Sequence, residues 1–247
     1  MSFVRTGRIR QVSGVDLIWF LRLWQYNFLD TSQGGFRMDE KCMRYKEIVF
    51  DVDGTLIDTE YAVLHSLQDT VCHFTGKTPE IASLTFALGI TGEDALLRLR
   101  ITDVDNALTY WEHALETYHQ SICVFDGIER LLCDLTACGY NLGIVTSKTR
   151  AEYETDFACF DIARHFSRVV CADDSVNHKP DPEPLLKYME KAKCRETELL
   201  YIGDSIYDRH CAESARCAFA LALWGAKKDM DGVCAFATPG DLLNGLI

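Results

Sequence analysis

Short apolar runs recur along this chain with helical segments between them, and all but the last of them lead into acidic or hydroxyl residues. The runs lie at 48–50, 140–148, 168–174, 198–205 and 217–225. Each is too short to be a helix of ordinary length, and most are rich in valine, isoleucine and leucine. Strands that alternate with helices are typical of a parallel sheet covered on both faces. This alternation therefore predicts an α/β fold built on such a sheet.

One long stretch near the start, from Thr59 to about Phe125, interrupts the alternation and is predicted to be all helix. Its first part, Thr59–Thr75, has apolar residues at helical spacing, with Thr59 as the expected N-cap. Two further helices are expected near Glu93–Arg100 and Asp103–Gln120. We therefore predict a Rossmann-like parallel sheet core with an inserted all-helical cap domain. The core takes residues 43–58 and 126–247, and the cap takes residues 59–125.

The charge balance limits the partners of this chain. Its formal net charge is −12 and its pI is about 5.0. An acidic surface argues against a nucleic-acid backbone or an anionic membrane as the main partner. A local basic pocket for a small anion is compatible with this charge. We expect no nucleic-acid partner, no membrane association, and a monomer or homodimer.

The eleven cysteines indicate reduced thiols rather than a disulfide framework or a zinc site. Their number is odd, no C-x-x-C pair occurs, and no cleavable signal peptide is recognisable. Most lie within apolar stretches and are predicted to be buried, including Cys72, Cys133, Cys138 and Cys217. These features predict a cytoplasmic protein.

The first 42 residues differ from the rest of the chain. Val15–Leu29 is rich in aromatic residues, but charged and amide residues interrupt it. It falls short of the roughly 18 apolar residues that a membrane-spanning helix needs. Because a strand begins a few residues after Met43, we hypothesise that Met43 is the natural start and that residues 1–42 are translated upstream sequence.

Polar residues at the ends of four strands predict a site at one edge of the sheet: Asp51 and Asp53, Thr146 and Ser147, Asp173 and Asp174, and Asp204 and Ser205. Ligands bind at the carboxyl ends of the strands in open α/β sheets. Asp51 and Asp53 are two residues apart on a strand, so both side chains point to one face. A carboxylate can act as a nucleophile when a neighbouring acid protonates the leaving oxygen and later deprotonates water. An anionic substrate there needs cations, either Lys179 or a Mg²⁺ held by acids such as Asp204 and Asp208.

Four segments together resemble the motifs of the haloacid dehalogenase (HAD) superfamily. They are DVDGTLID at 51–58, the strand that ends in Thr146, Lys179 before Pro-Asp-Pro, and GDSIYD at 203–208. They occur in the order of that family. The helical stretch lies where the phosphoglycolate phosphatase and β-phosphoglucomutase branch carries its cap. The resemblance covers roughly residues 45–225.

The resemblance implies a role for each matched residue. Asp51 would be the nucleophile and Asp53 the general acid and base. Thr146, with Ser147 beside it, would bind the phosphoryl group, and Lys179 would stabilise its charge. Mg²⁺ would be bound by Asp51, the backbone carbonyl of Asp53 and Asp204, with Asp208 supporting the metal. Lys148 and the cap residues His65, Arg98 and Arg100 are weaker candidates for binding the substrate.

We therefore expect a Mg²⁺-dependent phosphomonoester hydrolase that acts on a small phosphorylated metabolite through an aspartyl-phosphate. Asp53 argues against a dehalogenase, which needs no acid for its leaving group. A phosphomutase remains the enzymatic alternative, although Gly92 lies where mutases of this branch carry an arginine. The non-enzymatic alternative is a HAD-like binding module that does not catalyse a reaction.

Overall fold

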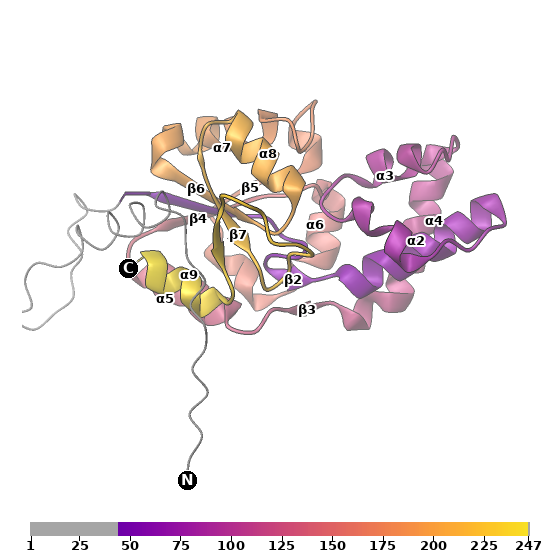
Figure 1. Cartoon of the computed structure of the whole chain (residues 1–247), viewed down its shortest axis with the longest axis horizontal. Helices are drawn as coiled ribbons and strands as arrows, with labels where there is room; N and C mark the ends of the chain where they lie inside the picture. The colour runs from indigo at the N-terminus through magenta and orange to yellow at the C-terminus, as the bar shows by residue number, and fades with distance from the viewer. Residues whose placement is uncertain (1–43, 247) are drawn as a thin grey trace, which may run out of the picture.

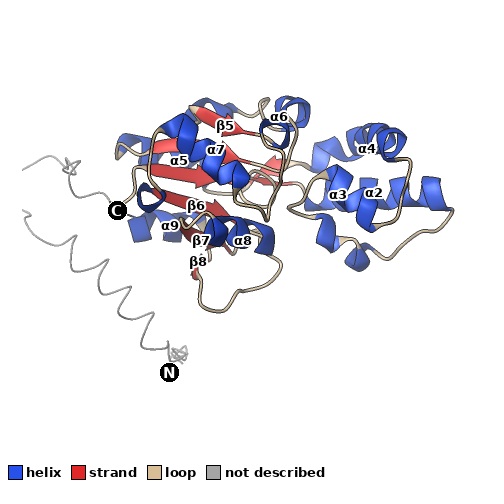
Figure 2. Cartoon of the chain, turned by 90° about the horizontal axis from the view of Figure 1, so that it is seen from above, coloured by secondary structure: helices blue, strands red, loops and turns tan. Residues whose placement is uncertain are grey.

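A parallel sheet forms the centre of the structure, a computed structural model that describes residues 44–246. Its strands are β1 (Glu47–Phe50), β4 (Asn141–Val145), β5 (Arg168–Val170), β6 (Leu199–Gly203), β7 (Ala218–Ala222) and β8 (Cys234–Phe236). Their order across the sheet is β5-β4-β1-β6-β7-β8, and every pairing is parallel (Figure 2). The predicted α/β fold class is confirmed.

Helices cover both faces of this sheet. They are α5 (Ile128–Ala137), α6 (Arg150–Asp156), α7 (Glu183–Ala192), α8 (Ile206–Ser214) and α9 (Pro239–Leu246). Alternate residues of β1 point to opposite faces, so Ile48 and Phe50 join one apolar cluster and Val49 joins another. The first cluster includes residues of α5, α6 and α9, and the second includes residues of α7 and α8. Burial on both faces explains why these strands are continuously apolar.

The inserted segment forms a separate helical unit beside the sheet (Figure 1). It contains α2 (Glu60–Thr75), α3 (Gly92–Arg98) and α4 (Val104–Tyr118), which share their own apolar cluster. Two short strands join it to the core: β2 (Ile57–Asp58) pairs antiparallel with β3 (Cys123–Val124). We call this unit the cap. Short 3-10 helices cover Ile81–Ser83, Thr85–Ala87, His119–Ser121, Asp161–His165, Ala172–Asp174 and Glu196–Glu198.

Several local predictions differ from the structure. The stretch from Thr59 to Phe125 is not all helix, because β3 and the 3-10 turns lie within it. Thr59 occupies the N-cap position of α2, but its side chain makes no capping hydrogen bond. Neither β8 nor α9 was predicted. The ten cysteines between residues 44 and 246 are free thiols, as predicted, but Cys133 is exposed while Cys217 is buried.

Two predictions lie outside the described residues: the proposed start at Met43 and the aromatic segment Val15–Leu29. Among the helices of residues 44–246, none combines the length and apolar character required to cross a membrane.

Candidate active site

Asp51 is buried where β1 ends, at the start of a tight turn. The turn brings Gly54 against the side chain of Asp204, which follows β6. Gly54 has a φ of 75°, and a Cβ at this position would lie 2.4 Å from Asp204 Oδ2. Only glycine adopts this conformation without strain and leaves room for the carboxylate. The Asp-Gly pair thus brings the ends of β1 and β6 together.

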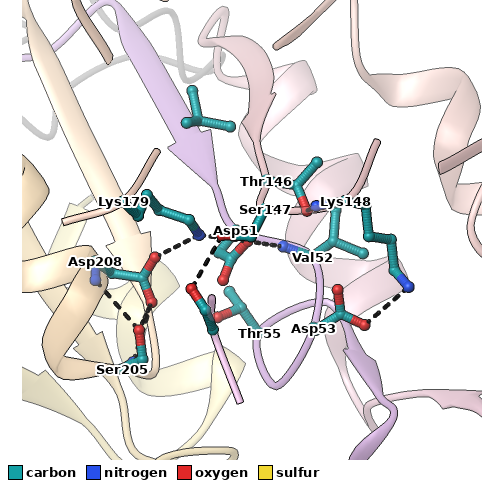
Figure 3. Close-up of polar contacts among 12 residues, drawn as sticks. Asp51, Val52, Asp53, Thr55, Thr146, Ser147, Lys148, Lys179, Ser205 and Asp208 are labelled. Atoms are coloured by element: carbon teal, nitrogen blue, oxygen red, sulfur yellow. Dashed lines mark hydrogen bonds and ion pairs between the residues drawn. The ribbon is translucent and has the colours of Figure 1, made fainter. Parts of the chain in front are cut away.

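Lys179 joins two of the predicted acids. Its Nζ lies 3.0 Å from Asp51 Oδ1 and 2.7 Å from Asp208 Oδ1, and all three side chains are buried (Figure 3). Burial works against the charged ammonium, but the carboxylates of Asp208 and Asp51 outweigh it and raise the pKa of Lys179. The lysine is therefore a fixed cation beside Asp51.

Asp208 uses both carboxylate oxygens within the protein. Its Oδ1 contacts Lys179 and lies 2.9 Å from the hydroxyl of Tyr201, whose oxygen lies 3.2 Å from Lys179 Nζ. Its Oδ2 accepts from the backbone N–H of Ser205 at 3.1 Å and from the Ser205 hydroxyl at 2.5 Å. Ser205 is also the N-cap of α8. These contacts hold Asp208 and, through it, Lys179.

Asp51, Asp204 and Asp208 form an acidic cluster that fits a divalent cation. One carboxylate oxygen from each lies within 4.8 Å of the others. Loss of hydration, together with the charges of Asp208 and Asp53, raises the pKa of Asp51 to about 8 despite Lys179. The pKa of Asp204 is raised as well, first by desolvation. Carboxylate oxygens so close together repel one another, and they are the ligands that Mg²⁺ prefers.

Asp53 lies beside Lys148 and away from Asp208 and Lys179 (Figure 3). Its Oδ1 lies 3.4 Å from Lys148 Nζ and accepts no hydrogen bond from any described residue. Lys148 is itself buried and donates to Asp156 Oδ2 of α6 at 2.7 Å. Burial opposes its charge, but Asp53 and Asp156 outweigh that effect and raise the pKa of Lys148. Asp53 therefore lies beside a second fixed cation, the ammonium group of Lys148.

Asp156→Asn is expected to reduce the free energy of unfolding by roughly 3 kcal/mol, because it breaks a buried ion pair and leaves Lys148 with the longer contact to Asp53 alone. Urea unfolding at pH 7 measures the change. Glu154→Gln, on an exposed position of the same helix, is the control and should change stability by less than about 0.5 kcal/mol. Equal stabilities for the two variants would show that the Lys148–Asp156 pair does not stabilise the fold.

A cavity of about 280 Å³ lies between the sheet edge and the cap. Asp51, Asp53, Ser147 and Lys148 line it from the core. Thr146 is buried at the end of β4, and its Oγ1 accepts from the backbone N–H of Lys148 at 3.2 Å. Ser147 donates its hydroxyl to the carbonyl of Gly89 in the cap at 3.0 Å. Residues that follow β1 and β4, two of the strand ends predicted to form the site, therefore line the same cavity.

Several predicted residues do not line this cavity, and Thr146, Lys179, Asp204 and Asp208 are among them. Asp173 and Asp174, at the end of β5, accept hydrogen bonds from Arg150. Arg98 donates to the hydroxyl of Tyr207 at 2.8 Å, which joins the cap to α8. His65 stacks on Tyr61 with ring centroids 3.9 Å apart. Arg100 is exposed and also lies outside the cavity lining.

Tyr201 and Asp156 contact site residues and were not predicted from the sequence. Tyr201 lies inside an apolar strand, and a buried tyrosine hydroxyl needs a polar partner, which is a usable signal. Asp156 is the eighth residue after Lys148 and carries no comparable signal, because its contact depends on where α6 packs.

Comparisons with known proteins agree with this geometry. The family model for haloacid dehalogenase-like hydrolases matches residues 48–222. Pyrophosphatase PpaX of Bacillus mycoides is 26% identical over 186 residues, which cover 75% of this chain and 86% of that protein. A Lactobacillus plantarum crystal structure, provisionally named a phosphoglycolate phosphatase, is 29% identical with a TM-score of 0.75, covering 82% of this chain and 100% of that one. A hydrolase structure from Pseudomonas syringae is 26% identical with a TM-score of 0.72, covering 82% of this chain and 97% of that one.

The matched range of the family model includes the ends of β1, β4 and β6, together with Lys179 and the cap. The resemblance noted from four short motifs is thereby confirmed over most of the chain. The chain belongs to the haloacid dehalogenase-like hydrolase family.

Proposed function

We propose that this hydrolase is a Mg²⁺-dependent phosphatase that cleaves a small phosphate monoester through an aspartyl-phosphate on Asp51. The observation that carries the proposal is the pairing of Asp51 with Lys179 beside an Asp53 that faces a cavity. A nucleophile, a cation and a separate acid group occupy three neighbouring positions. The names of the relatives, a pyrophosphatase and a phosphoglycolate phosphatase, support phosphoryl transfer.

In the first step, Asp51 Oδ2 attacks the phosphorus atom. Among the described residues, the contacts to Asp51 fall on Oδ1, which accepts from the Val52 N–H at 2.7 Å and pairs with Lys179. As the new P–O bond forms, the bond to the leaving alcohol oxygen breaks and its electron pair stays on that oxygen. Asp53, acting as the general acid, supplies the proton that this oxygen takes up.

In the second step, the Asp53 carboxylate removes a proton from water, and the water oxygen attacks the phosphorus. The P–O bond to Asp51 breaks, which releases phosphate and restores the Asp51 carboxylate. Thr146 and Lys179 bind the phosphoryl oxygens in both steps. The bound Mg²⁺ supplies positive charge that offsets the repulsion between these carboxylates and the phosphate.

We assign Asp51, Asp204 and the backbone carbonyl of Asp53 as the residues that hold the metal. Thr55 donates to Asp204 Oδ1 at 3.1 Å and so orients that carboxylate. Asp208 already contacts Lys179, Tyr201 and Ser205, so we assign it to positioning Lys179 and the acidic cluster. The cap, residues 59–125, covers the cavity and limits the access of bulk water, while the second step needs one water molecule beside Asp53.

Phosphate release from a panel of phosphate monoesters, with and without Mg²⁺, tests the proposal. We expect release that EDTA abolishes and added Mg²⁺ restores. A folded protein that releases no phosphate from any ester would instead favour a mutase or a binding module.

The affinity for Mg²⁺ is expected to fall by at least about tenfold per pH unit below pH 8, and more steeply where Asp204, whose pKa is also raised, must release a proton as well. The metal-free pKa of Asp51 is raised to about 8, so below that pH a proton must leave before the carboxylate can bind the ion. Calorimetric titration between pH 6 and 8 in two buffers with different ionisation enthalpies measures both the affinity and the proton released. A dissociation constant that does not change with pH would contradict this assignment of Asp51.

A further inference from the structure

Six apolar side chains form part of the cavity wall that the cap provides. Val63 of α2, Leu88 and Ile90 of the following loop, and Leu108, Trp111 and Leu115 of α4 line it. Because Asp51 and Asp53 line the same cavity from the core, a leaving group that departs beside them would contact this cap lining. An apolar wall favours an apolar ligand body and provides no hydrogen bonds to a second phosphate.

The charged residues at this cavity are mostly acidic. Glu112 and Glu116 of α4 and Glu152 of α6 line it in addition to the site aspartates. Among the described lining residues, Lys148 and His119 are the only basic ones, and Lys148 is already paired with Asp53 and Asp156. A smaller cavity of about 140 Å³ beside the site includes Lys227, which pairs with Glu60. A second anion on the substrate would therefore meet acids rather than an uncommitted lysine or arginine.

We propose that the substrate is the phosphate ester of an alcohol with an apolar, ring-sized body and no anionic group. The inference rests on the proposed phosphatase function and adds the chemical class of the leaving group. An apolar cavity of about 150 Å³ accommodates benzene, and the 280 Å³ available here must hold the phosphate as well. Pyrophosphate and phosphoglycolate, named for the relatives, both have anionic leaving groups and do not match this wall.

Three esters that share one ring test the charge class: benzyl phosphate, 4-carboxybenzyl phosphate and 4-aminomethylbenzyl phosphate. We expect kcat/KM for the carboxylate to be about tenfold below that for benzyl phosphate, because its anion faces the acidic residues. The amine should react at least as well as benzyl phosphate. A carboxylate ester that is hydrolysed as fast as the other two would overturn the inference while leaving the phosphatase function intact.

Val63 offers a variant that tests the wall directly. It is half-buried on α2, lines the cavity, and is not among the residues that form or pack against the apolar clusters. Val63→Lys should raise the ratio of kcat/KM for 4-carboxybenzyl phosphate to that for benzyl phosphate by about tenfold. Val63→Met adds similar length without charge and should leave this ratio unchanged.

The two proposals fail in different ways. Phosphate release from any of the three esters supports the phosphatase function whatever their order, and their order decides the leaving-group class. If Val63→Lys and Val63→Met give the same ratio, the cap wall does not select by charge, and the inference is wrong. If no ester of this set or of the wider panel releases phosphate, both proposals are overturned.

Discussion

Asp51→Asn is expected to lower Mg²⁺-dependent phosphate release by about 10⁴-fold or more, because an amide oxygen does not form the aspartyl-phosphate. Asp51 is buried, its Oδ1 is held by Lys179 and by the Val52 N–H, and it lines the cavity. No other described carboxylate combines these contacts. The measurement is the steady-state rate with saturating ester and Mg²⁺.

Asp173→Asn is the matched control, since Asp173 also follows a strand of the sheet but lies outside the cavity. It should keep nearly the full rate. Asp51→Asn should fold at least as stably as the parent protein, because it removes one charge from a crowded acidic cluster and Lys179 keeps Asp208. A folded Asp51→Asn protein that still turns over would exclude the aspartyl-phosphate route.

Asp53→Asn is expected to separate the two chemical steps. With 4-nitrophenyl phosphate, whose leaving group needs no proton, the variant should release about one nitrophenolate per site and then slow, because no base activates water. With an alkyl phosphate the first step also needs the acid, so the rate should fall by about 10²–10⁴-fold without a burst. Rapid-mixing absorbance measurements detect the burst.

The fold should survive this substitution because Lys148 keeps its 2.7 Å contact with Asp156. Thermal unfolding of Asp53→Asn checks that point. If the variant loses activity equally toward both esters and shows no burst, Asp53 acts in binding rather than in proton transfer.

The sheet could be predicted from the sequence because its strands are buried on both faces. Ile48, Val49 and Phe50 are all fully buried, and the apolar run is therefore unbroken until Asp51. The same property places the polar residues at strand ends, where Asp51, Thr146 and Asp204 were predicted to meet. The structure places these residues at neighbouring ends of β1, β4 and β6, and their catalytic roles remain predictions.

The elements that were missed depend on packing rather than on local pattern. The strands β2 and β3 have two residues each. They form because they pair with one another, although the whole cap separates them along the sequence. The edge strand β8 is three half-buried residues, and α9 packs against α5. The three strands have too few residues to establish a period of 2, whereas α9, with eight residues, is longer than the predicted α3, so its length does not explain why it was missed.

The charge partners inside the site are equally difficult to predict. Lys148 could not be distinguished from a surface lysine, because its burial comes from α6 and the turn after β1 rather than from its neighbours in the chain. The contact of Asp53 with Lys148, instead of with the acidic cluster, likewise depends on how the turn at Gly54 is placed.

The pairing of β2 with β3 has a consequence for how such a protein can change. Paired strands lie about 4.8 Å apart, so the chain leaves the core and returns to it at almost the same place. An inserted segment whose two ends are adjacent can be replaced by a different segment whose ends are equally close together, with little disturbance to the sheet. The ribbon Ile57–Asp58 and Cys123–Val124 therefore marks a natural crossover point for recombining caps. Exchanges made there would replace the cap lining of the cavity and leave the residues at the ends of β1, β4 and β6 unchanged.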